Sequence, residues 1–136
     1  MHPAHIVVIE ARNVPDLADK LYNNTAHTLD AHQIGHSRVT VPHVLNLPIA
    51  LRSLIEATRG AVHMPAEWRR PDGYIVIGAF IESQQAYTET LYREVLRNMQ
   101  DLACYYTLPI SYGFVAHAKA PVPEAAITQA VQNACA

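Results

Sequence analysis

The chain has 136 residues, half of them apolar, and its 12 acidic and 10 basic side chains leave a formal net charge of −2. This length predicts one domain with a sizeable core, and the lack of a basic excess argues against nucleic acid as a partner. We expect neither a signal peptide nor a membrane span, because no apolar run approaches the roughly 20 residues that a membrane helix needs. Cys104 and Cys135 lie far apart without a metal-binding spacing, which predicts free thiols in a reducing, cytoplasmic setting.

The first part of the chain is predicted to alternate strands and helices. His5–Ile9 (HIVVI) is a short β-branched run typical of a buried strand, and the polar residues Glu10–Asn13 are expected to form a turn. A helix follows, with Asn13 as its expected cap and Gly35 just beyond its end. Arg38–Val41 (RVTV) is then predicted to form a second short strand.

A second helix, a loop and the most apolar strand are expected next. Pro48 is placed to open the helix, which should stop near Gly60. The periodic pattern fails across Ala61–Gly73, where Pro, Gly and charged residues predict a loop. Tyr74–Ile81 is nearly continuous in apolar residues, which fits a strand buried on both faces.

The last third of the chain continues the alternation. After the polar residues Glu82–Gln85, apolar side chains recur at helical spacing up to Tyr106 and predict a long helix. Pro109–Ala116 is predicted to be the fourth strand, and Pro123–Cys135 the last helix. Strands that alternate with helices imply a parallel sheet. We therefore predict a flavodoxin-like three-layer α/β/α sandwich with a four-stranded parallel sheet, in one domain over residues 1–136.

The turns at the carboxyl ends of the predicted strands carry polar and aromatic side chains. In a parallel α/β sheet these turns meet along one edge, which is where ligands bind. The residues there are Arg12, Asn13, His43, Asn46, Glu82, Ser83, Gln85, Tyr87, Tyr112 and His117. They predict a site for a small molecule; the alternative is that they are only helix caps and solvated turn residues.

Metal and dinucleotide sites are not favoured. The spacings of His27, His32 and His36 do not bring all three to one helix face, and no cysteine or carboxylate completes a recognised ligand set. The first predicted strand is followed by EARN, with neither a GxGxxG nor a Walker sequence. We therefore expect no metal site and no dinucleotide bound in the usual manner.

Several stretches of the chain resemble segments of one family. VPHVLNLPIALRSL (Val41–Leu54) is similar to that family's VPGAFE-P segment and its helix, and IGAFIESQQAYTETLYREV (Ile77–Val95) resembles its LGAVIRG-T-H--Y segment. LPISYGFV (Leu108–Val115) resembles its VPVAFGVLT strand, and PEAAITQA resembles its last helix. The family is 6,7-dimethyl-8-ribityllumazine synthase, the penultimate enzyme of riboflavin synthesis, and the resemblance runs over nearly the whole chain.

This resemblance implies an activity, an assembly and a location for the site. The family condenses a ribityl-aminouracil with a four-carbon keto phosphate: phosphate leaves, a Schiff base forms and the ring closes, without a metal or an organic cofactor. Its members assemble as pentamers, some as decamers or sixty-subunit shells, and the active site lies between neighbouring subunits. The resemblance therefore implies a homo-oligomer, either a pentamer or a multiple of one.

Carried over residue by residue, the proton-transfer and phosphate positions differ from the family's pattern. The presumed proton-transferring histidine falls on Tyr87, a poor base near neutrality because the unperturbed pKa of tyrosine is about 10. The Arg-Gly of the same turn, close to the phosphate, falls on Glu82 and Ser83, and the phosphate-pairing arginine of the last helix falls on Gln129. A carboxylate at Glu82 would repel a phosphate.

The positions that contact the ring differ as well. The aromatic residue after the first strand, which stacks on the pyrimidine, falls on Asn13. The Phe-Glu of the second turn falls on Leu45 and Asn46, whereas the aromatic residue of the fourth strand is kept in kind as Tyr112. The departures fall on positions that contact the ligand, while the scaffold pattern survives.

We therefore predict an enzyme of lumazine synthase type that condenses an amine with a carbonyl substrate, either the riboflavin-pathway pair or a non-phosphorylated substitute. Tyr87 and His117 are the expected catalytic residues, and His117 and Arg12 are candidates for the proton-transfer and anion-binding roles lost elsewhere. The neutral, hydrogen-bonding pocket would be formed by Tyr87, Gln85, Glu82, Asn46, His43 and Tyr112. One alternative is a non-catalytic oligomer that binds a flavin- or pterin-like ring, and another is a monomeric flavodoxin-like binding module.

Overall fold

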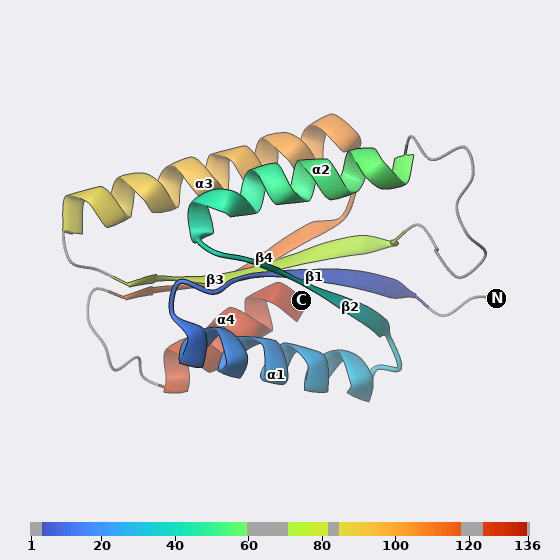
Figure 1. Ribbon diagram of the computed structural model, residues 1–136. Coiled ribbons are helices and arrows are strands. Elements are labelled where there is room, and N and C mark those ends of the chain that lie inside the picture. Colours follow the sequence, from blue (N-terminus) through green and yellow to red (C-terminus); the bar gives the residue numbers. More distant parts are fainter. Residues whose placement is uncertain (1–3, 60–70, 82–84, 118–123, 136) are drawn as a thin grey trace.

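The chain alternates strands and helices from its first strand to its last helix. The computed structural model describes residues 4–59, 71–81, 85–117 and 124–135 (Figure 1). In chain order the elements are β1 (His5–Ala11), α1 (Pro15–Ala31), β2 (Gly35–Val41), the short 3₁₀ helix η1 (Val44–Asn46), α2 (Leu47–Arg59), β3 (Gly73–Ile81), α3 (Gln85–Tyr106), β4 (Ile110–His117) and α4 (Glu124–Cys135).

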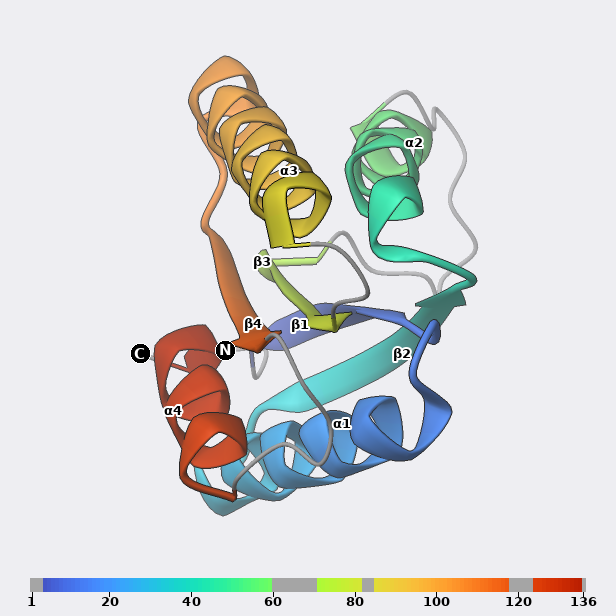
Figure 2. The ribbon, with the colours of Figure 1, turned by 90° about the vertical axis from the view of Figure 1, so that its left-hand side faces the viewer.

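The four strands form one parallel sheet between two helical layers. The strand order is β2-β1-β3-β4, and each neighbouring pair is parallel. Helices α1 and α4 cover one face of the sheet, and α2 and α3 cover the other, as the two views show together (Figure 1, Figure 2). The predicted three-layer α/β/α sandwich is confirmed.

Each face of the sheet has its own apolar core. Because successive strand residues point to opposite faces, Val8 packs under α1 with Leu21, whereas Ile9 packs under α2 with Leu51. All four of these side chains are fully buried. Burying a side chain such as Leu21 or Leu51 contributes about 1.5–3 kcal/mol, so both layers are held to the sheet largely by apolar burial.

Two strands are longer than their apolar residues predicted. β1 continues past Ile9 to Ala11, so Glu10 lies within the strand and not in a turn. β2 begins at Gly35, earlier than the predicted start at Arg38. The sequence predicted a turn at Glu10 because it is polar, but Glu10 forms an ion pair with Arg38 of the neighbouring strand, and a paired charge can occupy a strand.

The first helix does not begin as predicted. Its N-cap is Val14, which makes no side-chain capping hydrogen bond, and Pro15 occupies the first turn. Asn13 was expected to be the cap, but its side chain binds β3. Among the described residues, no helix is long and apolar enough to cross a membrane.

Candidate site at the carboxyl edge of the sheet

The turn after β1 joins the carboxyl ends of three strands. The backbone N–H of Arg12 donates to the carbonyl of Val41, the last residue of β2, at 2.9 Å. The Asn13 side chain donates from Nδ2 to the carbonyl of Ala79 in β3 at 3.0 Å. Oδ1 of Asn13 is buried and has no hydrogen-bond partner among the described residues. The turn is therefore hydrogen-bonded to both β2 and β3, and Oδ1 of Asn13 remains available as an acceptor.

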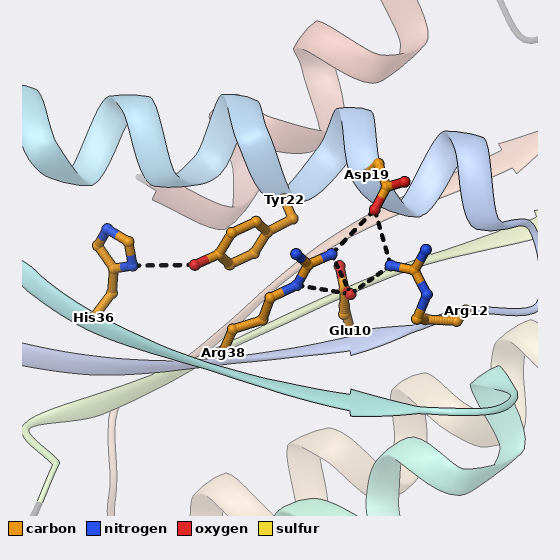
Figure 3. A network of polar contacts seen from close by, with 6 residues as sticks. All are labelled: Glu10, Arg12, Asp19, Tyr22, His36 and Arg38. Atoms are coloured by element: carbon orange, nitrogen blue, oxygen red, sulfur yellow. Dashed lines mark hydrogen bonds and ion pairs between the residues drawn. The ribbon is translucent and has the colours of Figure 1, made fainter.

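Four charged side chains lie on the α1 face beside this turn, and we call Glu10, Arg12, Asp19 and Arg38 the Glu10 cluster (Figure 3). Glu10 is fully buried, and its Oε1 accepts hydrogen bonds from Arg12 Nη1 at 2.9 Å and from Arg38 Nε at 2.8 Å. Asp19 of α1 accepts from Arg12 Nη1 at 2.9 Å and from Arg38 Nη2 at 3.2 Å. The cluster thus joins β1, β2 and α1 with two positive and two negative charges.

The contacts in the Glu10 cluster favour its charged forms. Hydrogen bonds from Arg12 and Arg38 lower the pKa of Asp19. Hydrogen bonds to Asp19 and Glu10 raise the pKa of Arg12. The Asp19 side chain is 51% exposed, so water and salt screen its ion pairs, whereas the Glu10 side chain is shielded from solvent.

The polar contacts continue along α1 toward the amino edge of the sheet. The Arg38 guanidinium lies 4.0 Å from the centre of the Tyr22 ring, a cation–π contact. The Tyr22 hydroxyl lies 3.4 Å from Nδ1 of His36 (Figure 3). On the other side of the ring, Nε2 of His36 lies 3.0 Å from Oδ1 of Asp30. His36 therefore belongs to a chain of side-chain contacts between β2 and α1.

The turn between β2 and α2 is closed by its own side chains. Nδ1 of His43 accepts from the backbone N–H of Leu45 at 3.2 Å, and Oδ1 of Asn46 accepts from the backbone N–H of His43 at 3.0 Å. These reciprocal bonds form a capping box around η1. In this structure His43 and Asn46 act as caps, which is the alternative that the sequence left open for them, while the Leu45 side chain is 54% exposed.

Tyr112 lies within β4, opposite Val76 of β3, and not in the turn that follows β4. Its ring stacks on Phe114 with the centroids 5.4 Å apart, and Phe114 packs edge-on against Phe80 at 5.2 Å. Tyr92 of α3 packs against Phe80 at 5.0 Å. Burial, with a smaller contribution from Tyr112, raises the pKa of Tyr92. We call Phe80, Tyr92, Tyr112 and Phe114 the aromatic cluster.

The other predicted site residues lie in several places. Glu82 and Ser83 lie outside the described residues. The segment Gln85–Tyr87 forms the start of α3, and His117 is the last residue of β4. Gln129 is exposed on α4, where its Nε2 donates to Oδ1 of Asn133 at 3.0 Å.

The model of the 6,7-dimethyl-8-ribityllumazine synthase family matches residues 3–133 of the chain. The chain belongs to this family. It is 31% identical over 113 residues to 6,7-dimethyl-8-ribityllumazine synthase 1 of Rhizobium meliloti, covering 83% of the chain and 70% of that relative. It is 28% identical to the synthase of Agrobacterium fabrum, over 85% of the chain and 74% of the relative. The synthase of a Methylobacterium species is 30% identical over 82% of the chain and 59% of the relative.

In this lumazine synthase family member, one chain does not bring all the predicted site residues together. Arg12 and Asn13 lie at the carboxyl edge, Tyr112 lies under α3 within the sheet, and Gln129 lies on α4 across the sheet from α3. Among the described residues, no group of three His, Cys, Asp or Glu side chains could hold a metal ion.

Sequence reasoning missed three members of the Glu10 cluster: Glu10, Asp19 and Arg38. One signal was available, because residues two apart in a strand point to the same face, so Glu10 and Arg12 had to be neighbours if β1 extended that far. The ion pair with Arg38 depends on the parallel register that places Glu10 opposite Thr40. That register cannot be deduced from a single strand.

Proposed function

We propose that this chain is an enzyme of lumazine synthase type, which condenses an amine with a carbonyl substrate at an interface between its own copies. Membership of the family supports the reaction class, and the three relatives described above are named as synthases of this kind. The finer part of the proposal concerns the substrate: we propose a carbonyl compound that carries no phosphate.

The observation that carries this choice is the pairing of Arg12. Arg12 is the cationic side chain that the structure places at the turn after β1, and it is bound by Glu10 and Asp19. Phosphate groups in proteins are usually bound by arginine or lysine through charge-assisted hydrogen bonds. A guanidinium already held by two carboxylates is a poor partner for another anion, so a neutral substrate is the better match.

Proton transfer is assigned to Tyr87 and His117. Tyr87 lies in the first turn of α3, the helix that follows β3, and His117 is the last residue of β4. Both residues therefore lie close to the carboxyl edge of the sheet. Histidine has an unperturbed pKa near 6.5 and can accept and return a proton near neutrality, whereas tyrosine is better suited to donating one. We propose His117 as the base and Tyr87 as the donor in imine formation.

The proposed assembly is a homo-oligomer, either a pentamer or a multiple of one, in the cytoplasm. Leu45 in η1 and Ile49 in α2 are 54% and 66% exposed, and Tyr105 of α3 is 76% exposed. They belong to η1, α2 and α3, and α2 and α3 form one helical layer on the sheet (Figure 2). Exposed apolar residues in one layer favour association with a second copy.

The test is product formation from the two substrates of the family, followed by absorbance, with the particle sized by light scattering. A second reaction replaces the keto phosphate with the corresponding four-carbon dihydroxyketone, which lacks the phosphate and from which water leaves in place of phosphate. The proposal predicts an oligomer, faster turnover of the phosphate-free ketone, and losses of about 10²-fold or more in Tyr87→Phe and His117→Asn. His32→Asn is the matched control for His117→Asn, because His32 is exposed and lies away from the carboxyl edge.

Two outcomes would contradict the proposal. Faster turnover of the phosphorylated substrate would show that a phosphate is accommodated. An oligomer that binds riboflavin or a pterin but forms no product from either pair would favour the non-catalytic alternative.

A further inference from the structure

We infer that Glu10 and Asp19 are specificity-determining residues, which exclude anionic ligands from the turn after β1 by binding Arg12. The inference rests on the proposed function, because it takes this turn as part of the ligand site. It goes further by extending the exclusion from phosphate to anions in general, which limits the ligand class at this turn to neutral or cationic molecules.

The geometry of Arg12 shows how this exclusion works. Oε1 of Glu10 and Oδ1 of Asp19 both accept from the same nitrogen, Nη1, at 2.9 Å (Figure 3). The Arg12 side chain remains 31% exposed, and the next residue is Asn13, whose amide bridges to β3. A guanidinium carries five N–H donors, so Arg12 has both the donors and the exposure to bind an anion. Its two carboxylate partners are what oppose that binding.

The charges in the cluster balance only while both carboxylates are present. Two arginines face two carboxylates, so the formal sum is zero, and removing the charge of Asp19 leaves a sum of +1. The amino end of α1 follows directly at Pro15, and the positive end of its dipole would add to that potential. The turn would then offer an anion both a net positive charge and hydrogen-bond donors.

Of the two carboxylates, Asp19 is the one that can be changed without disturbing the core. Its side chain is 51% exposed on α1, whereas the Glu10 side chain is fully buried in β1. Asp19→Asn keeps the size of the side chain and removes only its charge. This variant therefore separates the electrostatic effect from a packing effect.

The experiment is a calorimetric titration of the full chain with inorganic phosphate at low ionic strength. Wild-type protein should bind phosphate weakly, and Asp19→Asn should bind it about tenfold more tightly, a change of roughly 1.4 kcal/mol. The added affinity should fall as salt is raised, because salt screens exposed charges. Replacing Arg12 as well, in Asp19→Asn/Arg12→Gln, should abolish the gain.

A matched control carries the same change of charge elsewhere. Glu94→Gln removes the carboxylate that binds exposed Arg97 at 2.8 Å on α3. If Glu94→Gln gains as much phosphate affinity as Asp19→Asn, the gain reflects net charge alone and the inference is wrong. It is also wrong if Asp19→Asn gains nothing, or if wild-type protein already binds phosphate through Arg12. Because the readout is binding, the inference can survive even if the chain forms no product.

Discussion

Under α1 the sheet carries the Glu10 cluster, whereas under α3 it carries the aromatic cluster. The first joins β1, β2 and α1 by hydrogen bonds between charged groups, with distances from 2.5 to 3.2 Å. The second joins β3, β4 and α3 by ring contacts with centroids 5.0 to 6.2 Å apart. Both clusters hold a helix against the same sheet, but one depends on charge and direction and the other on apolar area.

This difference predicts how each face responds to change. Hydrogen bonds between charged groups are directional and sensitive to pH, and a buried carboxylate is costly once its partners are lost. Aromatic packing tolerates small shifts, because ring pairs are favourable over a range of separations. Substitutions and pH changes should therefore affect the α1 and α4 face more than the α2 and α3 face.

The largest difference in stability between the two faces is expected at the glycines that allow helices to approach the sheet. A Cβ on Gly113 would collide with the backbone carbonyl of Ala130 and lie 2.9 Å from the Cβ of Ala134, so α4 would have to move. A Cβ on Gly78 would meet the tip of the Val44 side chain at 3.1 Å, which can shift. Gly113→Ala should cost about 3 kcal/mol of unfolding free energy and Gly78→Ala about 1 kcal/mol, as measured by urea denaturation. Equal losses would show that the two helical layers approach the sheet equally closely.

The next largest effect is expected at Glu10. In Glu10→Gln, two arginines lose a negative partner, and an amide N–H₂ replaces Oε2, which is buried with no partner among the described residues. The lost charge and the buried amide should together lower the free energy of unfolding by about 2 kcal/mol, as measured by urea denaturation. Tyr112→Phe on the aromatic face should change stability by less than about 0.5 kcal/mol, because it keeps the stacked ring. A loss at Glu10 no larger than that at Tyr112 would show that the cluster contributes little.

The fold was accessible from the sequence because it depends on local patterns. The apolar run Tyr74–Ile81 predicted β3 within one residue of its observed start, and the helical spacing up to Tyr106 predicted the end of α3. Each of these signals lies within one element, and the alternation of strands and helices then implied a parallel sheet.

The arrangement at the carboxyl edge was less accessible, because it depends on partners from different elements. Glu10 was expected in a turn because it is polar, and nothing near it in sequence shows that Arg38 neutralises it from β2. His43 and Asn46 were placed correctly at the turn before α2, but their mutual capping bonds depend on the backbone path of η1. Residue type located the turns, whereas the side-chain partners required the structure.

Acid should destabilise the α1 face through Asp19. The pKa of Asp19 is lowered in the folded chain by hydrogen bonds from Arg12 and Arg38, so its contribution is present above the unfolded pKa of about 3.9 and is lost as pH falls through the folded value. Urea denaturation between pH 6 and about pH 3 should show a shallower loss in Asp19→Asn than in wild-type protein. If the free energy of unfolding falls equally with pH in both proteins, the ion pairs of Asp19 are fully screened by solvent.

The smallest effect on stability is expected at alkaline pH, and it concerns the sheet face covered by α2 and α3. Burial raises the pKa of Tyr92, so its contribution is present below the unfolded pKa of about 10 and is lost as pH rises through the folded value. Tyr92→Phe cannot ionise and keeps its edge-on contact with Phe80, so its stability should fall less than that of wild-type protein above about pH 10. Tyr105→Phe is the control, because its ring is 76% exposed and lacks the burial that acts on Tyr92. If both variants reduce the alkaline loss equally, tyrosine ionisation on this face is not governed by burial, and the aromatic cluster is more open to solvent than its ring contacts indicate.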